Sequence, residues 1–332
     1  MAPETLPNPT LNPQLLAQLA VPNGPVFSLA WSRDGRRLAA ASFEKIHLWD
    51  VTSEAVASLT ETAPFLGHPH FIWGLAWSPD GSRLASACTQ GPVKVWDCAT
   101  WQDSASFDTG DWSFCVAWAP DGKRLAVGTG AFSDPARPET FSGKSQVWDV
   151  AAGRKIREAE VTSFIVSTAW SPDGRTIATG LGDGRLILWD AESGAARHSA
   201  VASPERCDVN GLAWSPDGRW LATAQQDGKV RLWDPARGMV VQTLAGCKGQ
   251  MRGLAWSPDG SLLAAAGQGG EIFVWRARDA QDGRALARWS AGSEMIWSLA
   301  WSPDGRTLAA GDGIFDEALH DANLFLFNLE DL

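Results

Sequence analysis

Large apolar and small residues alternate along short stretches of this chain, and residues 209–244 show the pattern most clearly. Residues 209–215 alternate in this way, which indicates a strand with two different faces. A turn is expected at residues 216–218, because Pro216 presets φ and Gly218 accepts the left-handed conformation. A second turn is expected at residues 226–228. Three further stretches have strand character: residues 220–224, 230–233 and 240–244. The segment therefore predicts four short antiparallel strands.

The same pattern occurs seven times, each time with Ala-Trp, then Ser or Ala, then Pro or Arg, then Asp-Gly. The tryptophans of this motif are Trp31, Trp77, Trp118, Trp170, Trp214, Trp256 and Trp301. A second motif, Trp-Asp, follows in the first five repeats, and Trp275-Arg276 and Phe327-Asn328 replace it in the last two. Two motifs that recur in register indicate a repeat protein in which each repeat folds as one unit.

A repeat of this length with a Trp-Asp dipeptide resembles the WD-repeat β-propeller family, in which each blade has four strands. The resemblance covers residues 14–332 and implies an all-β fold, a seven-bladed β-propeller of four-stranded antiparallel blades. One blade is too small to bury both of its faces, so the seven blades must stack into a single domain. Residues 1–13 contain four prolines and are expected to form a flexible arm.

The two ends of the chain are expected to complete one blade together. Residues 325–327 have the position of a third strand, and no fourth strand follows them. Residues 15–20 (LLAQLA) precede the first inner strand, where an outer strand belongs. We therefore predict that the last blade is closed by the N-terminal strand, which removes exposed sheet edges.

Charge and cysteine content narrow the classes of function. The net charge of −10 argues against extensive binding of nucleic acid or of an anionic membrane. No apolar run approaches the roughly 20 residues that cross a bilayer. Five cysteines without Cys-x-x-Cys spacing indicate neither a disulfide framework nor a zinc site. Residues 1–20 contain no basic residue and do not resemble a signal peptide. We expect a cytoplasmic protein that is a monomeric ring by itself.

The sequence contains no catalytic motif of the serine-elbow, phosphate-loop or zinc-protease type. Two segments offer metal-ligand residue types: His68-Pro69-His70 together with His320, and the acidic residues within 312–321. The repeat already explains His68, and the acidic segment lacks the alternating carboxylate spacing of calcium loops. Structural roles are therefore favoured. We predict that the protein is not an enzyme and binds no metal or cofactor.

The buried hydrogen-bond network typical of the family is predicted to be incomplete. In WD repeats it often joins a His before the inner strand, a Ser or Thr on the second strand, the Trp of Trp-Asp and an Asp before the third strand. The repeat with His68 also has Ser86 and Trp96, but Gln90 stands where the Asp should be. The repeats that have this Asp lack the His, so no repeat has all four members.

Aromatic residues outside the two motifs indicate a binding face. Four positions before each repeat tryptophan stand Phe27, Trp73, Phe114, Val166, Asn210, Arg252 and Trp297. Two positions further back stand Pro25, Phe71, Trp112, Phe164, Asp208, Gln250 and Met295. The resemblance implies that these positions surround the mouth of the axial channel, opposite the Pro-Asp-Gly turns, where partners commonly dock. Repeats 1 to 4 and 7 are apolar there, whereas repeats 5 and 6 are polar.

Two insertions are expected on the same face. The third and seventh repeats are longer than the others between the repeat Trp and the third strand. The additional residues are 131–144 and 311–321, in the loop between the second and third strands. Long loops on one face of a regular scaffold are a common place for recognition.

The sequence therefore predicts a non-catalytic protein–protein interaction scaffold that binds a protein or peptide segment over the aromatic face. The three polar residues at the channel mouth, Asp208, Asn210 and Arg252, would orient the partner. The predicted partner-binding residues are Phe27, Phe71, Trp73, Trp112, Phe114, Phe164, Asp208, Asn210, Arg252 and Trp297.

Three alternatives stay open at this stage. The protein could bind a small ligand or a modified peptide in an aromatic cage, which requires two or three rings within about 6 Å of one point. The same rings could be ordinary packing at the channel mouth. A structural subunit with edge-to-edge contacts would instead expose apolar residues on the outer strands.

Overall fold

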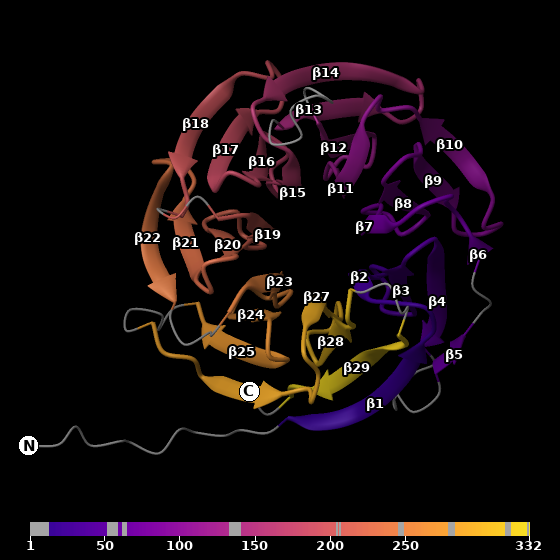
Figure 1. Cartoon of the computed structure of the whole chain (residues 1–332), viewed down its shortest axis with the longest axis vertical. Helices are drawn as coiled ribbons and strands as arrows, with labels where there is room; N and C mark the ends of the chain where they lie inside the picture. The colour runs from indigo at the N-terminus through magenta and orange to yellow at the C-terminus, as the bar shows by residue number, and fades with distance from the viewer. Residues whose placement is uncertain are drawn as a thin grey trace, which may run out of the picture.

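The chain forms a closed ring of seven antiparallel sheets, with the inner strands near the axis and the outer strands at the rim (Figure 1). The computed structural model describes residues 13–51, 59–61, 65–132, 141–203, 205, 207–244, 249–277, 283–315, 320–330 and 332. The predicted all-β, seven-bladed architecture is confirmed. Among the described residues, no helix has the length and hydrophobicity needed to cross a membrane.

The first three blades follow one another along the chain. Blade 1 contains β2 (Val26–Trp31), β3 (Arg37–Ser42), β4 (Lys45–Val51), β5 (Leu59–Glu61) and β6 (Phe65–Leu66), of which β5 and β6 both pair with β4. Blade 2 contains β7 (Ile72–Trp77), β8 (Arg83–Cys88), β9 (Val93–Asp97) and β10 (Asp103–Phe107). Blade 3 contains β11 (Trp112–Trp118), β12 (Arg124–Phe132), β13 (Phe141–Asp149) and β14 (Arg154–Val161).

The next three blades repeat this order, and the strands of blade 5 agree with the predicted ones to within one residue at each end. Blade 4 contains β15 (Ile165–Trp170), β16 (Thr176–Leu181), β17 (Arg185–Asp190) and β18 (Ala196–Val201). Blade 5 contains β19 (Val209–Trp214), β20 (Leu221–Gln225), β21 (Val230–Asp234) and β22 (Met239–Leu244). Blade 6 contains β23 (Met251–Trp256), β24 (Leu262–Gly267), β25 (Glu271–Arg276) and β26 (Ala287–Ser290).

Blade 7 joins the two ends of the chain, as predicted. It contains β27 (Ile296–Trp301), β28 (Thr307–Asp312), β29 (Ala322–Asn328) and, as its outer strand, β1 (Gln14–Val21). Pairing between β1 and β29 runs from Gln14 opposite Asn328 to Val21 opposite Ala322. In Figure 1 the indigo β1 lies along the yellow β29. Of the arm expected at residues 1–13, all but Pro13 lies outside the described residues.

The Pro-Asp-Gly turns are held by the same hydrogen bonds in most blades. In blade 5, Ser215 Oγ donates to Asp217 Oδ1 at 2.6 Å and accepts the Trp220 backbone N–H at 2.9 Å. Asp217 Oδ1 also accepts the Arg219 N–H, and Gly218 takes φ +70°, which a residue with a side chain rarely adopts. The repeated Ser-Pro-Asp-Gly thus encodes one hydrogen-bonded turn.

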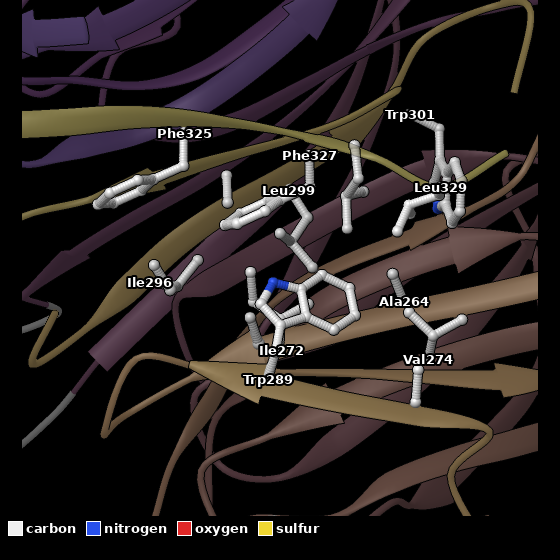
Figure 2. Packing of buried hydrophobic residues seen from close by; sticks show 14 of the residues in the cluster. Ala264, Ile272, Val274, Trp289, Ile296, Leu299, Trp301, Phe325, Phe327 and Leu329 are labelled. Carbon is white, nitrogen blue, oxygen red and sulfur yellow. The ribbon is translucent and has the colours of Figure 1, made fainter. Parts of the chain in front are cut away.

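Neighbouring blades pack large side chains against small ones, as the alternation predicts. Gly211 faces blade 6, and a Cβ added there would lie 2.6 Å from the Arg252 carbonyl oxygen. Trp214, on the opposite face of β19, reaches blade 4. Figure 2 shows one such layer between blades 6 and 7, in which Trp289 packs edge-on against Phe327 with centroids 5.4 Å apart. The core is therefore a series of layers between blades.

Indole groups join most inner strands to the preceding blade. Trp77 Nε1 donates to the Ala30 carbonyl oxygen at 3.0 Å, and Trp118 Nε1 donates to that of Ala76 at 3.0 Å. The same bond joins Trp31 to Ala300, Trp214 to Ala169, Trp256 to Ala213 and Trp301 to Ala255. Trp170 differs, because its buried Nε1 has no hydrogen-bond partner among the described residues.

The incomplete hydrogen-bond network of blade 2 also agrees with the sequence. His68 Nε2 lies 2.7 Å from Ser86 Oγ, and Trp96 Nε1 donates to the same hydroxyl at 2.9 Å. His68 Nδ1 is buried without a partner among the described residues. Burial lowers the pKa of His68 to about 3, so the imidazole is neutral near pH 7. Three of the four members are present, and the acid that would hold Nδ1 is missing.

Candidate functional site

One face of the propeller, here called the top face, contains the starts of the inner strands and the loops between second and third strands. Strand pairing places Val26 opposite Ser42 and Ile72 opposite Cys88. The start of each inner strand therefore lies beside the end of the second strand, where the loop to the third strand begins. The Pro-Asp-Gly turns lie at the other end of each sheet, which is the bottom face. The predicted partner-binding residues and the described residues of both insertions therefore belong to the top face. Of the insertions, residues 133–140 and 316–319 lie outside the described residues.

A cavity of about 190 Å³ lies on the propeller axis. One residue from each blade, four positions before its repeat tryptophan, lines this cavity: Phe27, Trp73, Phe114, Val166, Asn210, Arg252 and Trp297. The sequence register thus located the wall of the channel correctly. The residues two positions earlier do not line this cavity. Three of them, Phe71, Trp112 and Phe164, contact the aromatic side chains beside it.

Six aromatic side chains form a cluster centred on Phe27: Phe27, Phe43, Phe71, Trp73, Trp297 and Phe315. Phe27 stacks on Trp73, with 4.3 Å between ring centroids, and meets the edge of Trp297 at 5.2 Å. Phe315 lies 5.7 Å from Phe27. Only 7% of Phe27 is exposed, whereas 49% of Phe315 is. The aromatic cluster thus has a buried centre and an accessible outer member.

Two members of the aromatic cluster, Phe43 and Phe315, were absent from the predicted site. Both lie in loops between second and third strands, where the repeat gives no register. Phe43 adopts φ +47°, a conformation that costs a bulky residue energy unless its surroundings hold it. Its ring contacts Phe27 at 6.0 Å and Phe71 at 4.8 Å. The one available signal was that residues 311–321, which include Phe315, form an insertion on this face.

A line of ring contacts extends from the aromatic cluster into blades 3 and 4. Trp73 meets Phe114 at 6.2 Å, and Phe114 meets Phe164 at 6.1 Å. Phe141, at the start of β13, meets Phe164 at 5.2 Å. Trp112 lies 6.5 Å from Phe114 and borders a groove of about 570 Å³ with Pro92 and Asp111. The seven predicted aromatic residues therefore form one continuous arc over blades 7, 1, 2, 3 and 4.

The polar side of the mouth lies on blades 5 and 6. Asn210 Nδ2 donates to the Met251 carbonyl oxygen at 2.9 Å. The Arg252 guanidinium lies over the Trp297 ring, 4.5 Å from its centroid. Burial lowers the pKa of Arg252, and the charge of Asp208 opposes this effect. Burial likewise raises the pKa of Asp208 against the effect of Arg252. The charges of Asp208 and Arg252 thus act on one another.

Comparison with known families agrees with this geometry. The family model described as "WD domain, G-beta repeat" matches residues 14–50, 59–97 and 200–234. The model described as "Anaphase-promoting complex subunit 4 WD40 domain" matches residues 142–207 and 243–304. The chain is a WD-repeat β-propeller. No curated protein matches it. WD-repeat propellers generally act as non-catalytic scaffolds that bind other proteins.

This WD-repeat propeller presents no evident metal site within the part of the chain that the structure describes, where no group of three His, Cys, Asp or Glu side chains could hold an ion. His68 is buried against Ser86. Asp312, the first acid of the segment considered for calcium, is buried and accepts hydrogen bonds from Asn323. Both side chains are thus in structural contacts.

Proposed function

We propose that this WD-repeat propeller is a non-catalytic scaffold that binds a protein segment along the aromatic arc of its top face. The observation that carries the proposal is the distribution of exposed apolar side chains. Among the described residues, four of the eight exposed large hydrophobic side chains border this arc: Trp112 (36% exposed), Phe141 (39%), Ile314 (40%) and Phe315 (49%). Exposed apolar residues gathered in one region usually mark an interaction site.

The residues of the arc have different roles in this proposal. Trp112 and Phe315 contact the partner directly, because their rings are accessible and aromatic anchors dominate interface energies. A second set of aromatic residues is half-buried and supplies further apolar surface: Phe71, Trp73, Phe114, Phe164 and Trp297. Phe27 supports its neighbours from below, since almost none of it is exposed. Asp208, Asn210 and Arg252 orient the segment at the polar side.

A segment spread over several blades explains the arc better than a caged small ligand or modified residue. A cage needs an open point between its rings. Here Phe27 lies between Trp73 and Trp297, whose own centroids are 6.3 Å apart. The Phe27 ring therefore occupies the place where a caged cation would sit. The continuation of the arc through Phe114 to Phe141 adds a length that a small ligand does not need.

The other exposed apolar residues belong to outer strands: Leu15, Val201, Met239 and Val241. Leu15, Met239 and Val241 lie on β1 and β22, away from the top-face ends of these strands, and serve here as controls. Val201 lies at the top-face end of β18, opposite Arg185 at the start of β17. We further propose that the ring is monomeric by itself, that it binds neither nucleic acid nor membranes, and that it works in the cytoplasm. The net charge of −10 supports the second point.

Affinity purification with two matched variants tests the proposal. Proteins retained by the tagged wild-type chain would be identified by mass spectrometry and compared with those retained by the double variant Trp112→Ala/Phe315→Ala. The specific partner should be lost, because removal of each anchoring aromatic residue weakens binding by about 30-fold. The control, Met239→Ala, removes an exposed apolar side chain from β22 and should retain the partner.

Circular dichroism and thermal melting would show that both variants fold. Direct titration of the recovered partner against each variant then gives the affinities. Undiminished binding by the folded double variant would place the site elsewhere. Loss of binding by Met239→Ala alone would favour an interface on the outer strands, as expected of a structural subunit.

A further inference from the structure

An arginine that forms no ion pair with any of the described residues indicates the chemistry of the bound segment. Arg252 lies on β23 at the wall of the axial cavity. Its Nε is buried and has no hydrogen-bond partner among the described residues, none of which forms an ion pair with it. The side chain as a whole is half-buried, and its guanidinium stacks on Trp297. A buried donor without a partner loses its hydration without compensation. Arg252 is therefore positioned to bind an anion.

Asn210, on the adjacent blade, has an unsatisfied acceptor. Its Nδ2 donates to the carbonyl oxygen of Met251, the residue before Arg252, so the two side chains start from neighbouring positions. Its Oδ1 is buried without a partner among the described residues. Buried polar atoms are rarely left unbonded. Arg252 Nε and Asn210 Oδ1 thus place an unsatisfied donor and an unsatisfied acceptor on neighbouring blades, both beside the cavity that Trp73, with its own unsatisfied Nε1, also lines.

We propose that the channel mouth binds the carboxylate of an Asp or Glu side chain in the partner segment. The Arg252 guanidinium donates hydrogen bonds to this carboxylate, and Asn210 Oδ1 accepts a backbone N–H of the same segment. This inference rests on the proposed function, because it names the chemistry of the segment that crosses the top face.

The surroundings of Arg252 favour a carboxylate over a phosphate group. A guanidinium offers parallel N–H donors that match two oxygens of a carboxylate or of a phosphate, so the charge of the anion decides between the two. Stacking on Trp297 restricts the plane of the Arg252 guanidinium. Asp208 is close enough for its charge to act on Arg252. Arg252 can neutralise the single charge of a carboxylate, whereas a doubly charged phosphate would keep a second negative charge near Asp208.

The neighbouring rings predict an apolar residue beside the acidic one. Trp297 contacts the Arg252 guanidinium. It also contacts Phe27 and Phe315, two members of the aromatic cluster. A segment whose carboxylate reaches Arg252 therefore has its adjacent residues over exposed aromatic carbon. The expected motif is an acidic residue flanked by a large apolar one.

Selection from a phage-displayed library of random peptides tests this inference. Peptides recovered with the wild-type protein would be synthesised with amidated C-termini, so that side chains carry their only carboxylates. Fluorescence anisotropy would then give their affinities. We expect an Asp or Glu at one fixed position, and replacement of that residue by Asn or Gln should weaken binding at least about tenfold.

Two variants with the same substitution separate Arg252 from general effects. Arg252→Met keeps an apolar stem against Trp297 and should bind the acidic and amide peptides equally. Arg219→Met is the control, because Arg219 also lies over a tryptophan ring, at 5.1 Å from the Trp220 centroid, but on the bottom face. It should keep the wild-type preference. Thermal melting of both variants confirms that they fold.

The possible outcomes distinguish this inference from the proposed function. Peptides that need Trp112 and Phe315 but show no acidic preference would overturn the inference and leave the proposed function standing. An acidic preference that persists in Arg252→Met would also overturn it. Failure of the wild-type protein to select any peptide would overturn both.

Discussion

The indole Nε1 of Trp31 donates a hydrogen bond to the carbonyl oxygen of Ala300 at 3.3 Å, although the two residues are 269 positions apart in the sequence. Trp31 ends β2 of blade 1, and Ala300 lies in β27 of blade 7. The bond therefore closes the ring on its axial side, while pairing of β1 with β29 closes it at the rim. The same indole bond at five other blade interfaces makes it a regular element of the fold.

Removal of one such bond should destabilise the ring by a measurable amount. We expect Trp118→Phe to lower the free energy of unfolding by roughly 1 kcal/mol more than Trp170→Phe. Trp118 donates to the Ala76 carbonyl oxygen, which would lose this partner, whereas the Trp170 indole N–H has no partner among the described residues. Urea unfolding of both variants gives the comparison.

Trp170 is a close control for Trp118 because the two environments are alike. Both side chains are buried, and each has an arginine guanidinium over its ring, Arg83 for Trp118 and Arg124 for Trp170. Loss of indole packing should therefore cost both variants the same. Equal destabilisation would show that the indole–carbonyl bonds contribute no net stability.

The repeat made the fold predictable because one local pattern fixes strands, turns and register seven times. The strands of blade 5 followed from alternation and turn residues, and the last blade followed from Phe325-Leu326-Phe327 and residues 15–20. The indole bonds were not predicted. Their signal, the repeated Ala-Trp dipeptide, was visible, but donor and acceptor lie on different blades and meet only when the blades stack.

The candidate site was predictable only where it follows the repeat. Channel-lining residues such as Trp73 and Arg252 have a fixed offset from the repeat tryptophan. Phe43 and Phe315 have none, because they lie in loops whose course depends on tertiary contacts. Nor could the sequence predict that Arg252 lacks an ion-pair partner among the described residues, because this depends on which side chains the neighbouring blades place near it.

The serine–aspartate turns predict loss of stability in acid. Ser78 Oγ donates to Asp80 Oδ1 at 2.6 Å, and this bond is the main reason that the pKa of Asp80 falls to about 2. A carboxylate whose pKa is lower in the folded state stabilises the fold above its unfolded pKa, and that stability is lost as pH falls. We expect the melting temperature to decrease from about pH 4 toward pH 2.

The variant Ser78→Ala tests the origin of this loss. It should cost about 1 kcal/mol near pH 7, and its difference from wild type should shrink toward pH 2, where Asp80 becomes protonated in both proteins. Ser104→Ala is the control, because the Ser104 hydroxyl donates to the Val95 carbonyl oxygen and has no carboxylate partner within the described part of the chain. Its difference should stay constant with pH. A constant difference for Ser78→Ala as well would contradict the explanation.

The outer strand β1 should be essential to the ring. Removal of residues 1–13 leaves β1 intact and should leave the melting temperature nearly unchanged. Removal of residues 1–21 deletes β1 and with it the buried Val21 and the apolar contacts of Leu16 and Leu19 to blade 7. The edge of β29 would be exposed, so a much lower melting temperature or aggregation is expected. Equal melting of the two truncated chains would contradict the role of β1.

His68 should make the stability of the fold sensitive to pH between pH 7 and pH 5.5. Burial lowers its pKa from 6.5 to about 3, so the unfolded chain binds a proton below pH 6.5 that the folded chain excludes. Because the unfolded state then binds more protons, stability decreases as the pH is lowered, by about 1 kcal/mol from pH 7 to pH 5.5. Urea unfolding at several pH values in this range measures the loss of stability.

The variant His68→Gln carries no titratable group at this position, so its loss of stability should be smaller by this amount. The control His70→Gln removes a nearby exposed histidine and should lose as much stability as the wild type. If His68→Gln and wild type lose stability in parallel, the imidazole is protonated in the folded protein, and another residue has replaced the acid missing at Gln90.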